Sequence, residues 1–232
     1  ISAIVGAQGT DGSAMFTTAC TYGGPSNTLD DCGNVQSAFV GQGTMFGASY
    51  AFSDEFTVAV GYAGDGKTAS TGLMTAEGLD AVGINAAYTT DTYGLSVTYA
   101  SVETAHASGT AKGVYSDTSV ALNGYFSPEG FPSISAGYEF TDIGGAGVNV
   151  DEKTSFFVGL QFDEVGPGSA GVAVGTQGSI TEGNDEALMY EAYYSYPVND
   201  GMTITPLVYA KEATSSTAVS YTHLRAHETA CN

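Results

Sequence analysis

Two cysteines lie close together in a polar loop and have the clearest chemistry in the chain. Cys20 and Cys32 are 12 positions apart in a segment rich in Gly, Asn and Asp. This setting favours a disulfide bond formed in an oxidising compartment, such as the periplasm or the cell surface. The alternative is a pair of free thiols in a reducing cytosol. A zinc site is disfavoured, because no histidine lies near the pair and two thiolates are too few ligands.

Histidine, the usual general base, is scarce. The chain has three histidines, and only His106 lies before residue 219. It stands among Ala and Ser residues, and no Ser–His–Asp arrangement can be argued from it. His223 and His227 have the i, i+4 spacing of a helical metal site, but no further ligand accompanies them. The sequence therefore predicts no enzyme, no metal site and no other cofactor.

Acidic residues dominate the charge of the chain. Asp and Glu number 25 against 5 Lys and Arg, which gives a formal net charge of -20. Nucleic acid is not expected as a partner, because phosphate binding needs clustered Lys and Arg. Carboxylates around a water-filled passage would instead favour cations.

Residues 45–62 carry the pattern that the rest of the chain repeats. Their sequence, MFGASYAFSDEFTVAVGY, has an apolar residue at every second position in two arms, which the polar turn 53–55 separates. A period of two on both sides of a short turn predicts an antiparallel β-hairpin. Comparable turns recur at intervals of 37, 37, 36 and 36 residues. The turns are centred on Asp54, Asp91, Pro128, Glu164 and Asp200.

The two kinds of connection between the predicted strands differ in length. Turns inside the hairpins are short, whereas the links between hairpins are longer and rich in Gly, Ser, Thr, Asp and Glu. These links span residues 64–78, 104–116, 142–152 and 178–185. Short turns on one rim and long loops on the other are typical of a transmembrane β-barrel. We therefore predict an all-β, antiparallel transmembrane barrel, with about eleven strands visible in this sequence.

The two faces of the predicted strands carry different side chains. One face has large apolar residues, and the other has Gly, Ala, Ser, Thr, Asn and Gln with few charges. Small neutral residues suit the concave inside of a barrel, and large apolar residues suit the outside, in contact with lipid. We predict that the lumen face and the long first loop line the pore and set its selectivity, through Asp30, Asp31, Asn85, Asn123, Glu139, Gln161 and Glu191.

Aromatic residues concentrate near the predicted short turns. Placed on one rim of a barrel, they would form an aromatic girdle at the level of the lipid headgroups. The predicted girdle consists of Tyr50, Phe52, Phe56, Tyr88, Tyr93, Phe126, Tyr138, Phe140, Phe162, Tyr194 and Tyr196. The competing interpretation is a soluble β-structure whose aromatics cap a core. In that case the chain would be a secreted, acidic, Gly-rich surface or adhesin domain with calcium-binding loops, although no regular calcium-binding spacing occurs.

The repeated hairpins and the segment YEAYYSYPVNDGMTITPLVYAKE (190–212) resemble cyanobacterial outer-membrane porins. These are identified with the carbohydrate-selective porin family, similar to OprB, and the resemblance covers roughly residues 1–215. It implies a barrel of about 16 to 18 strands, usually a homotrimer, which lets ions and small hydrophilic solutes, including sugars, diffuse across the outer membrane. On this basis we expect the chain to be a C-terminal barrel fragment.

The last residues depart from the strand pattern. Residues 219–232 (VSYTHLRAHETACN) hold the one Arg, two of the three His and the third Cys. The stretch resembles a translated adaptor sequence. We therefore expect residues 1–218 to be a porin barrel fragment and residues 219–232 to be a non-native tail.

The cysteine pair gives the first testable prediction. Mass spectrometry of a digest under non-reducing conditions should find the peptides of Cys20 and Cys32 joined. Closing a loop of this length typically stabilises a fold by about 2–4 kcal/mol where strain is low. Recovery of both cysteines as alkylated free thiols would contradict the pairing.

Overall fold

The structure, a computed structural model, describes residues 1–6, 13–25, 29, 32, 44–64, 79–106, 113–144, 152–176, 178–212 and 219–228. These residues form thirteen β-strands. Among them, no helix has the length and the apolar character needed to cross a membrane. The fold is all-β, as the alternation in the sequence predicts.

All thirteen strands belong to one antiparallel sheet. Twelve of them lie side by side in the order of the chain, and the short β10 (Ile180–Thr181) pairs with β8 away from this path. The strands on the path are β1 (Ser2–Gly6), β2 (Thr44–Ala51), β3 (Phe56–Gly64), β4 (Asp80–Thr89), β5 (Tyr93–His106), β6 (Gly113–Phe126), β7 (Ser133–Asp142), β8 (Glu152–Val165), β9 (Gly168–Thr176), β11 (Leu188–Asn199), β12 (Met202–Lys211) and β13 (Val219–Glu228).

The five predicted hairpins are confirmed, with one shift in position. Residues Val165 and Gly168 pair across the β8–β9 turn, so this turn lies at Gly166-Pro167 rather than at Glu164. Gly166 has a φ of 62°, which is a left-handed conformation that glycine adopts without a Cβ penalty. The glycine therefore selects the turn, and β8 runs a few residues further than its alternation alone indicates.

Two strands were not predicted. β10 has two residues, too few for a period of two to show. β13 covers most of the predicted tail and pairs with β12 from Met202↔Glu228 to Lys211↔Val219. The expectation that these residues lie outside the strand pattern was therefore wrong for residues 219–228; their non-native origin stays a prediction.

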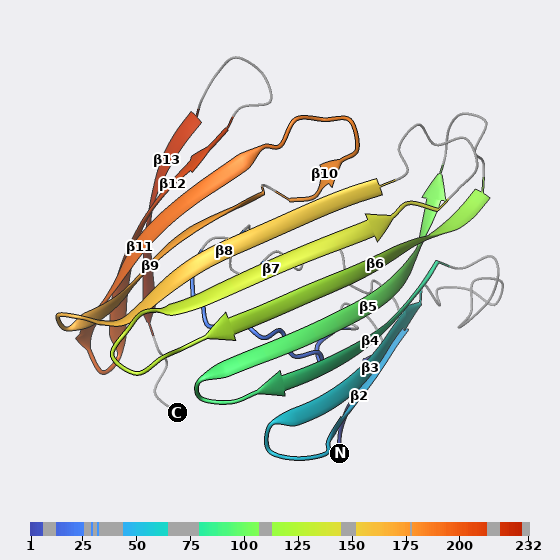
Figure 1. Ribbon diagram of the computed structural model, residues 1–232, viewed down its shortest axis with the longest axis horizontal. Helices are drawn as coiled ribbons and strands as arrows, with labels where there is room; N and C mark the ends of the chain where they lie inside the picture. Colours follow the sequence, from blue (N-terminus) through green and yellow to red (C-terminus); the bar gives the residue numbers. More distant parts are fainter. Residues whose placement is uncertain are drawn as a thin grey trace.

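The sheet curves strongly but does not close among the described residues. Short turns gather along its lower left edge, and the strand ends that the longer connections join lie towards the opposite edge (Figure 1). β1 and β13 are the two ends of the strand order, and no ladder between described residues joins them. The arrangement gives the two rims that the connection lengths predict.

Burial separates the two faces of the sheet residue by residue. Residues 13–25, with Leu29 and Cys32, are the inner segment; they pack against one face, which we call the inner face. Leu95 and Leu122 on the outer face are 66% and 55% exposed, whereas their neighbours Ser96 and Asn123 on the inner face are 5% and 4% exposed. Small polar residues are therefore buried and large apolar residues exposed, the reverse of a water-soluble sheet.

The inner face holds two apolar clusters under the inner segment. One joins Met45, Ala63, Ala81 and Ala100 from β2 to β5, with Phe16 of the inner segment packed against them. The other gathers Tyr22 and Leu29 of the inner segment onto Phe157, Met189 and Leu207. The inner segment thus completes the core on this side of the sheet.

Arginine substitutions on exposed valines test which face meets lipid. Val158 and Val198 are similarly exposed, at 43% and 40%, but Val158 lies mid-strand in β8 and Val198 is next to the last residue of β11. In a bilayer, Val158→Arg should cost about 2–4 kcal/mol and Val198→Arg about 0–1 kcal/mol, because the penalty falls towards the interface. Denaturant unfolding from lipid vesicles measures both.

Water around the outer face would remove this difference. A soluble sheet tolerates arginine at either exposed position, so small and equal effects of the two substitutions would contradict the assignment of the outer face to lipid.

Candidate functional site

The inner segment crosses the inner face of the sheet from β4 to β11. Its trace lies behind the sheet in Figure 1, in blue. It belongs to the long connection between β1 and β2, yet it contacts strands that follow it by as many as 169 positions. The candidate functional site is therefore the inner segment together with the inner face of the sheet, which we also call the wall.

Backbone amides of alternate residues in the inner segment donate to side-chain oxygens of four strands, β4, β5, β7 and β8. The four bonds are Thr17 N to Asn85 Oδ1 (2.9 Å), Ala19 N to Ser96 Oγ (2.9 Å), Thr21 N to Ser135 Oγ (2.9 Å) and Gly23 N to Gln161 Oε1 (3.3 Å). Alternation along the segment follows from its extended backbone, in which successive N–H groups point to opposite sides. The segment is thus fixed by one acceptor on each of these strands.

Asn85 holds both backbone groups of one residue. Its Oδ1 accepts from Thr17 N, and its Nδ2 donates to Thr17 O at 3.1 Å and to Thr98 Oγ1 at 2.8 Å. The side chain is fully buried, so these partners replace the hydrogen bonds that it would make to water. An amide is suited to this position because it carries a donor and an acceptor together.

Tyr22 fills a socket in the inner wall. Its ring lies 5.2 Å from Phe157 and 5.6 Å from Tyr193, measured between ring centroids. The floor of the socket consists of Gly159 and Gly171, where an added Cβ would lie only 2.8 and 2.9 Å from the Tyr22 ring. Side chains are therefore excluded at both positions while Tyr22 is docked.

Glu191 closes the end of the socket. Tyr22 Oη donates to Glu191 Oε1 at 2.6 Å, and the short distance is typical of a charge-assisted bond. The carboxylate is 4% exposed, and its Oε2 has no hydrogen-bond partner among the described residues. Beside it, Gln161 Oε1 accepts from Tyr193 Oη as well as from Gly23.

The disulfide ties the inner segment to itself at a second anchor. Cys20 and Cys32 are bonded, with their Cα atoms 6.4 Å apart. Asn123 Nδ2 donates to Cys32 O at 2.9 Å, and Gly137 gives that carbonyl room, because a Cβ there would stand 1.9 Å from it. The predicted pairing therefore sits directly on β6 and β7.

The residues predicted to line the pore fall into two groups. Five of them lie on the inner face and are buried: Asn85, Asn123, Glu139, Gln161 and Glu191. Asp30 and Asp31 lie outside the described residues. Contacts place Asn85, Asn123, Gln161 and Glu191 directly against the inner segment. Alternation predicted that these residues share one face of the sheet, but it did not predict that the inner segment covers that face.

Most members of the predicted aromatic girdle lie near short turns, and their role at a membrane interface stays a prediction. Tyr50, Phe52 and Phe56 surround the β2–β3 turn, and Phe52 packs against both others with ring centroids 4.7 and 5.5 Å apart. Five further members lie within a few residues of short turns: Tyr88, Tyr93, Phe126, Phe162 and Tyr196. Tyr138 and Phe140 do not, because β7 begins at Ser133 and they occupy its middle and its far half. Tyr194 lies mid-strand in β11, but its hydroxyl donates to Val165 O, beside the β8–β9 turn, at 2.9 Å.

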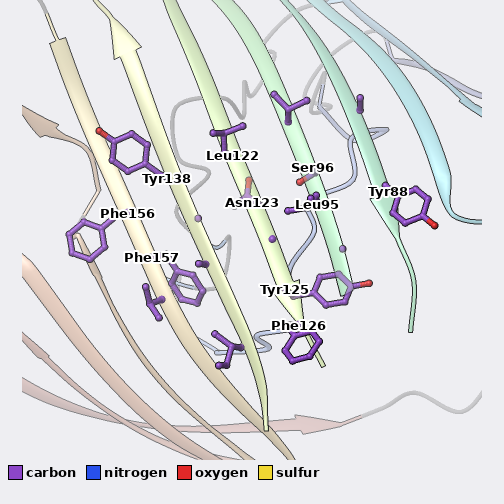
Figure 2. A pocket seen from close by; sticks show the side chains of 18 of the residues that line it. Tyr88, Leu95, Ser96, Leu122, Asn123, Tyr125, Phe126, Tyr138, Phe156 and Phe157 are labelled. Atoms are coloured by element: carbon purple, nitrogen blue, oxygen red, sulfur yellow. The ribbon is translucent and has the colours of Figure 1, made fainter. Parts of the chain in front are cut away.

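The outer face has a hollow of about 800 Å³ over β3 to β8. Gly124 of β6 pairs with Ala136 of β7. Because both residues are small, the surface is depressed there between larger neighbouring side chains. Leu95, Leu122 and Tyr138 stand around the depression (Figure 2). Because the hollow is apolar and opens on the outer face, it adds no polar site to the inner wall.

Sequence reasoning missed Ser96, Ser135 and Tyr22. The two serines looked like ordinary small residues of the lumen face, and nothing near them marks the amides that they accept from. Tyr22 precedes Gly23-Gly24, and this pair was assigned only as part of a turn-rich loop. Gly24 in fact lies against Glu191 Oε1, 2.4 Å from where its Cβ would be.

Two solved outer-membrane protein structures are similar to this chain. An anion-selective porin from Comamonas acidovorans matches with a TM-score of 0.61 and 14% identity, over 88% of this chain and 57% of its own. OmpT, an outer membrane protein of Vibrio cholerae in its trimer form, matches with a TM-score of 0.63 and 10% identity, over 97% of this chain and 74% of its own. The fold is that of an outer-membrane β-barrel.

Identities this low establish the fold alone. The chain spans 57% of the length of the Comamonas porin. No protein-family model matches the chain, and no curated protein matches it. The predicted barrel fold is confirmed, and membership of the carbohydrate-selective family stays a prediction.

A methyl group at position 159 should dislodge the inner segment. In Gly159→Ala the new Cβ would lie 2.5 Å from Phe157 Cζ and 2.8 Å from Tyr22 Cδ2, and overpacking of this kind costs about 1–3 kcal/mol. Chymotrypsin should then cleave after Tyr22 faster than in the unaltered protein.

Gly201→Ala is the matched control, because its Cβ would meet a single atom, Asn199 Oδ1, at 3.6 Å. Cleavage after Tyr22 should be unchanged in this variant. Equal cleavage rates in both variants would show that Gly159 is not part of a socket.

Proposed function

We propose that the protein forms a passive diffusion channel for ions and small hydrophilic solutes in the outer membrane. The observation that carries the proposal is the inverted distribution of side chains. Polar residues are buried on the inner face and large apolar residues are exposed on the outer face, within a fold shared with outer-membrane proteins. An apolar band outside and a polar wall inside are what a channel across a bilayer needs.

The position of the inner segment is consistent with a narrow channel. The segment covers the wall from β4 to β11 and occupies part of the space on the inner side of the sheet. A passage bounded by backbone, hydroxyl and amide groups selects solutes by size and hydrogen bonding rather than by a tight binding site. This function is that of a channel and not of an enzyme.

We further propose that the channel prefers cations. Glu139 and Glu191 lie in the wall and are 1% and 4% exposed, and charges with so little water around them are poorly screened. Asp30 and Asp31 belong to the same long connection as the inner segment. The Comamonas protein is described as anion-selective, but at 14% identity its wall residues do not carry over to this chain.

The proposal extends to the family, the assembly and the solutes. The resemblance of residues 190–212 supports a cyanobacterial porin of the carbohydrate-selective family, and so supports sugars among the solutes. A homotrimer is supported by the trimer form of the Vibrio protein. The barrel-like fold favours a channel over a secreted adhesin domain.

Reversal potentials across planar bilayers in a KCl gradient test the proposal. The protein should give a reversal potential of cation-selective sign, and neutralising the four proposed acids should move it towards zero. The substitutions are Asp30→Asn, Asp31→Asn, Glu139→Gln and Glu191→Gln. An anion-selective sign, or a potential unmoved by this variant, would refute the cation preference.

A second variant removes the same amount of negative charge from the rim that the short turns form. Its targets are exposed acids on short turns, and the substitutions are Asp54→Asn, Glu55→Gln, Asp91→Asn and Glu129→Gln. These carboxylates are surrounded by water, which screens them, so the shift in reversal potential should be smaller. An equal shift would assign the selectivity to net charge and not to the wall.

A further inference from the structure

The inner segment has two anchors of different chemistry. One is the Tyr22 socket, which is held by packing and by the bond to Glu191. The other is Cys32, which is held to β6 by Asn123 and to the middle of the segment by the disulfide with Cys20. Only the second anchor contains a covalent bond that can be opened under mild conditions.

The backbone at Cys32 adds to the importance of this bond. Its φ is 58°, the one positive value recorded for a non-glycine residue in the described part of the chain. Residues with a Cβ adopt this left-handed conformation only when their surroundings hold them there. Three interactions do so at Cys32: the disulfide, the bond from Asn123, and the bond from Cys32 N to Leu29 O at 3.1 Å.

The two sulfur-bearing residues differ in access. Cys32 is 1% exposed, whereas Cys20 is partly exposed. An incoming thiolate would therefore reach the disulfide at Cys20 first. Thiol–disulfide exchange depends on such access to one of the two sulfurs.

We propose that the inner segment is a redox-sensitive latch, docked on the channel wall while Cys20 and Cys32 are bonded and released when they are reduced. Its effect on permeation rests on the proposed channel function. Its effect on docking does not, because it follows from the contacts of the inner segment alone.

A small dithiol is the reductant that the latch requires. One of its thiolates attacks Cys20 Sγ, which breaks the Cys20–Cys32 bond and releases Cys32 as a thiolate that takes up a proton. The second thiolate of the reductant then attacks the reductant's first sulfur, which breaks its bond to Cys20 Sγ and releases Cys20 as a thiolate that also takes up a proton. Two electrons pass to the protein, which ends with two thiols, and the reductant leaves as a cyclic disulfide.

Hydrogen exchange measures the release directly. Amides of the inner segment that donate to the wall, such as those of Thr17, Ala19 and Thr21, exchange only when the segment undocks. Opening the disulfide removes the covalent link between Cys20 and Cys32, which favours the undocked state through chain entropy. Dithiothreitol should therefore speed exchange in residues 17–23 by about tenfold to a hundredfold. Amides of β4 to β8 should keep their protection.

The double variant Cys20→Ser, Cys32→Ser is the control. Its inner segment should exchange at the rate of the reduced protein and should not respond to dithiothreitol, while unchanged protection of the strands shows that the barrel has folded. Exchange in residues 17–23 that stays within about twofold on reduction would overturn the latch. Reduction of the unaltered protein gives the same test if the variant does not fold.

Bilayer recordings separate the latch from the channel. Dithiothreitol should raise the mean conductance of the unaltered protein and leave that of the double-serine variant unchanged. A protein that never conducts would refute the proposed function, and hydrogen exchange would still decide the latch. A conducting protein with unaltered conductance and unaltered exchange would refute the latch alone.

Discussion

The unbroken antiparallel ladder is the constraint on which the rest of the structure depends. Strands β2 to β9, and likewise β11 and β12, have a paired neighbour on both sides, so their backbone groups are already used in the sheet. A segment that crosses the face of such a sheet finds no free strand backbone, yet its own N–H groups need partners. Side chains must supply them, and this is why Asn, Ser and Gln stand where the inner segment passes. The ladder therefore determines the chemistry of the wall.

Glycines allow the inner segment to approach the wall closely. Most inner positions need only be small, but Gly137, Gly159 and Gly171 lie directly beneath atoms of the inner segment. At these points the segment approaches the backbone of the sheet more closely than any side chain permits. The glycines therefore record the path of the segment, although each also costs conformational entropy within its strand.

The sequence predicts what depends on local period and leaves out what depends on distant contacts. Alternation in residues 45–62 and in its repeats is enough to identify the hairpins and the two faces. β13 escapes this reasoning because VSYTHLRAHE alternates poorly and is recognised as a strand only by its pairing with β12. Tyr138 was predicted to lie beside a short turn, but it lies in the middle of β7. The reason is similar: alternation identifies the face on which a residue lies and not its position along the strand.

The predicted lumen residues show the same division. Glu191 was assigned to the correct face by its position between apolar neighbours. Its burial could not be predicted, since it depends on Tyr22, which precedes it by 169 positions. Cys20 and Cys32 are the exception, because their spacing of 12 places both partners within one short stretch.

The inner segment precedes the strands that it contacts, and this order has a consequence for folding. Its contacts span 68 positions to Asn85, 114 to Ser135 and 169 to Glu191. Such long separations carry a large loop-closure cost and form slowly. Docking cannot be complete before β11 has joined the sheet, so a segment that precedes the strands it contacts is among the last parts of the described structure to reach its native place. During assembly it must stay on the concave side of the growing sheet, because strands added later would otherwise shut it out.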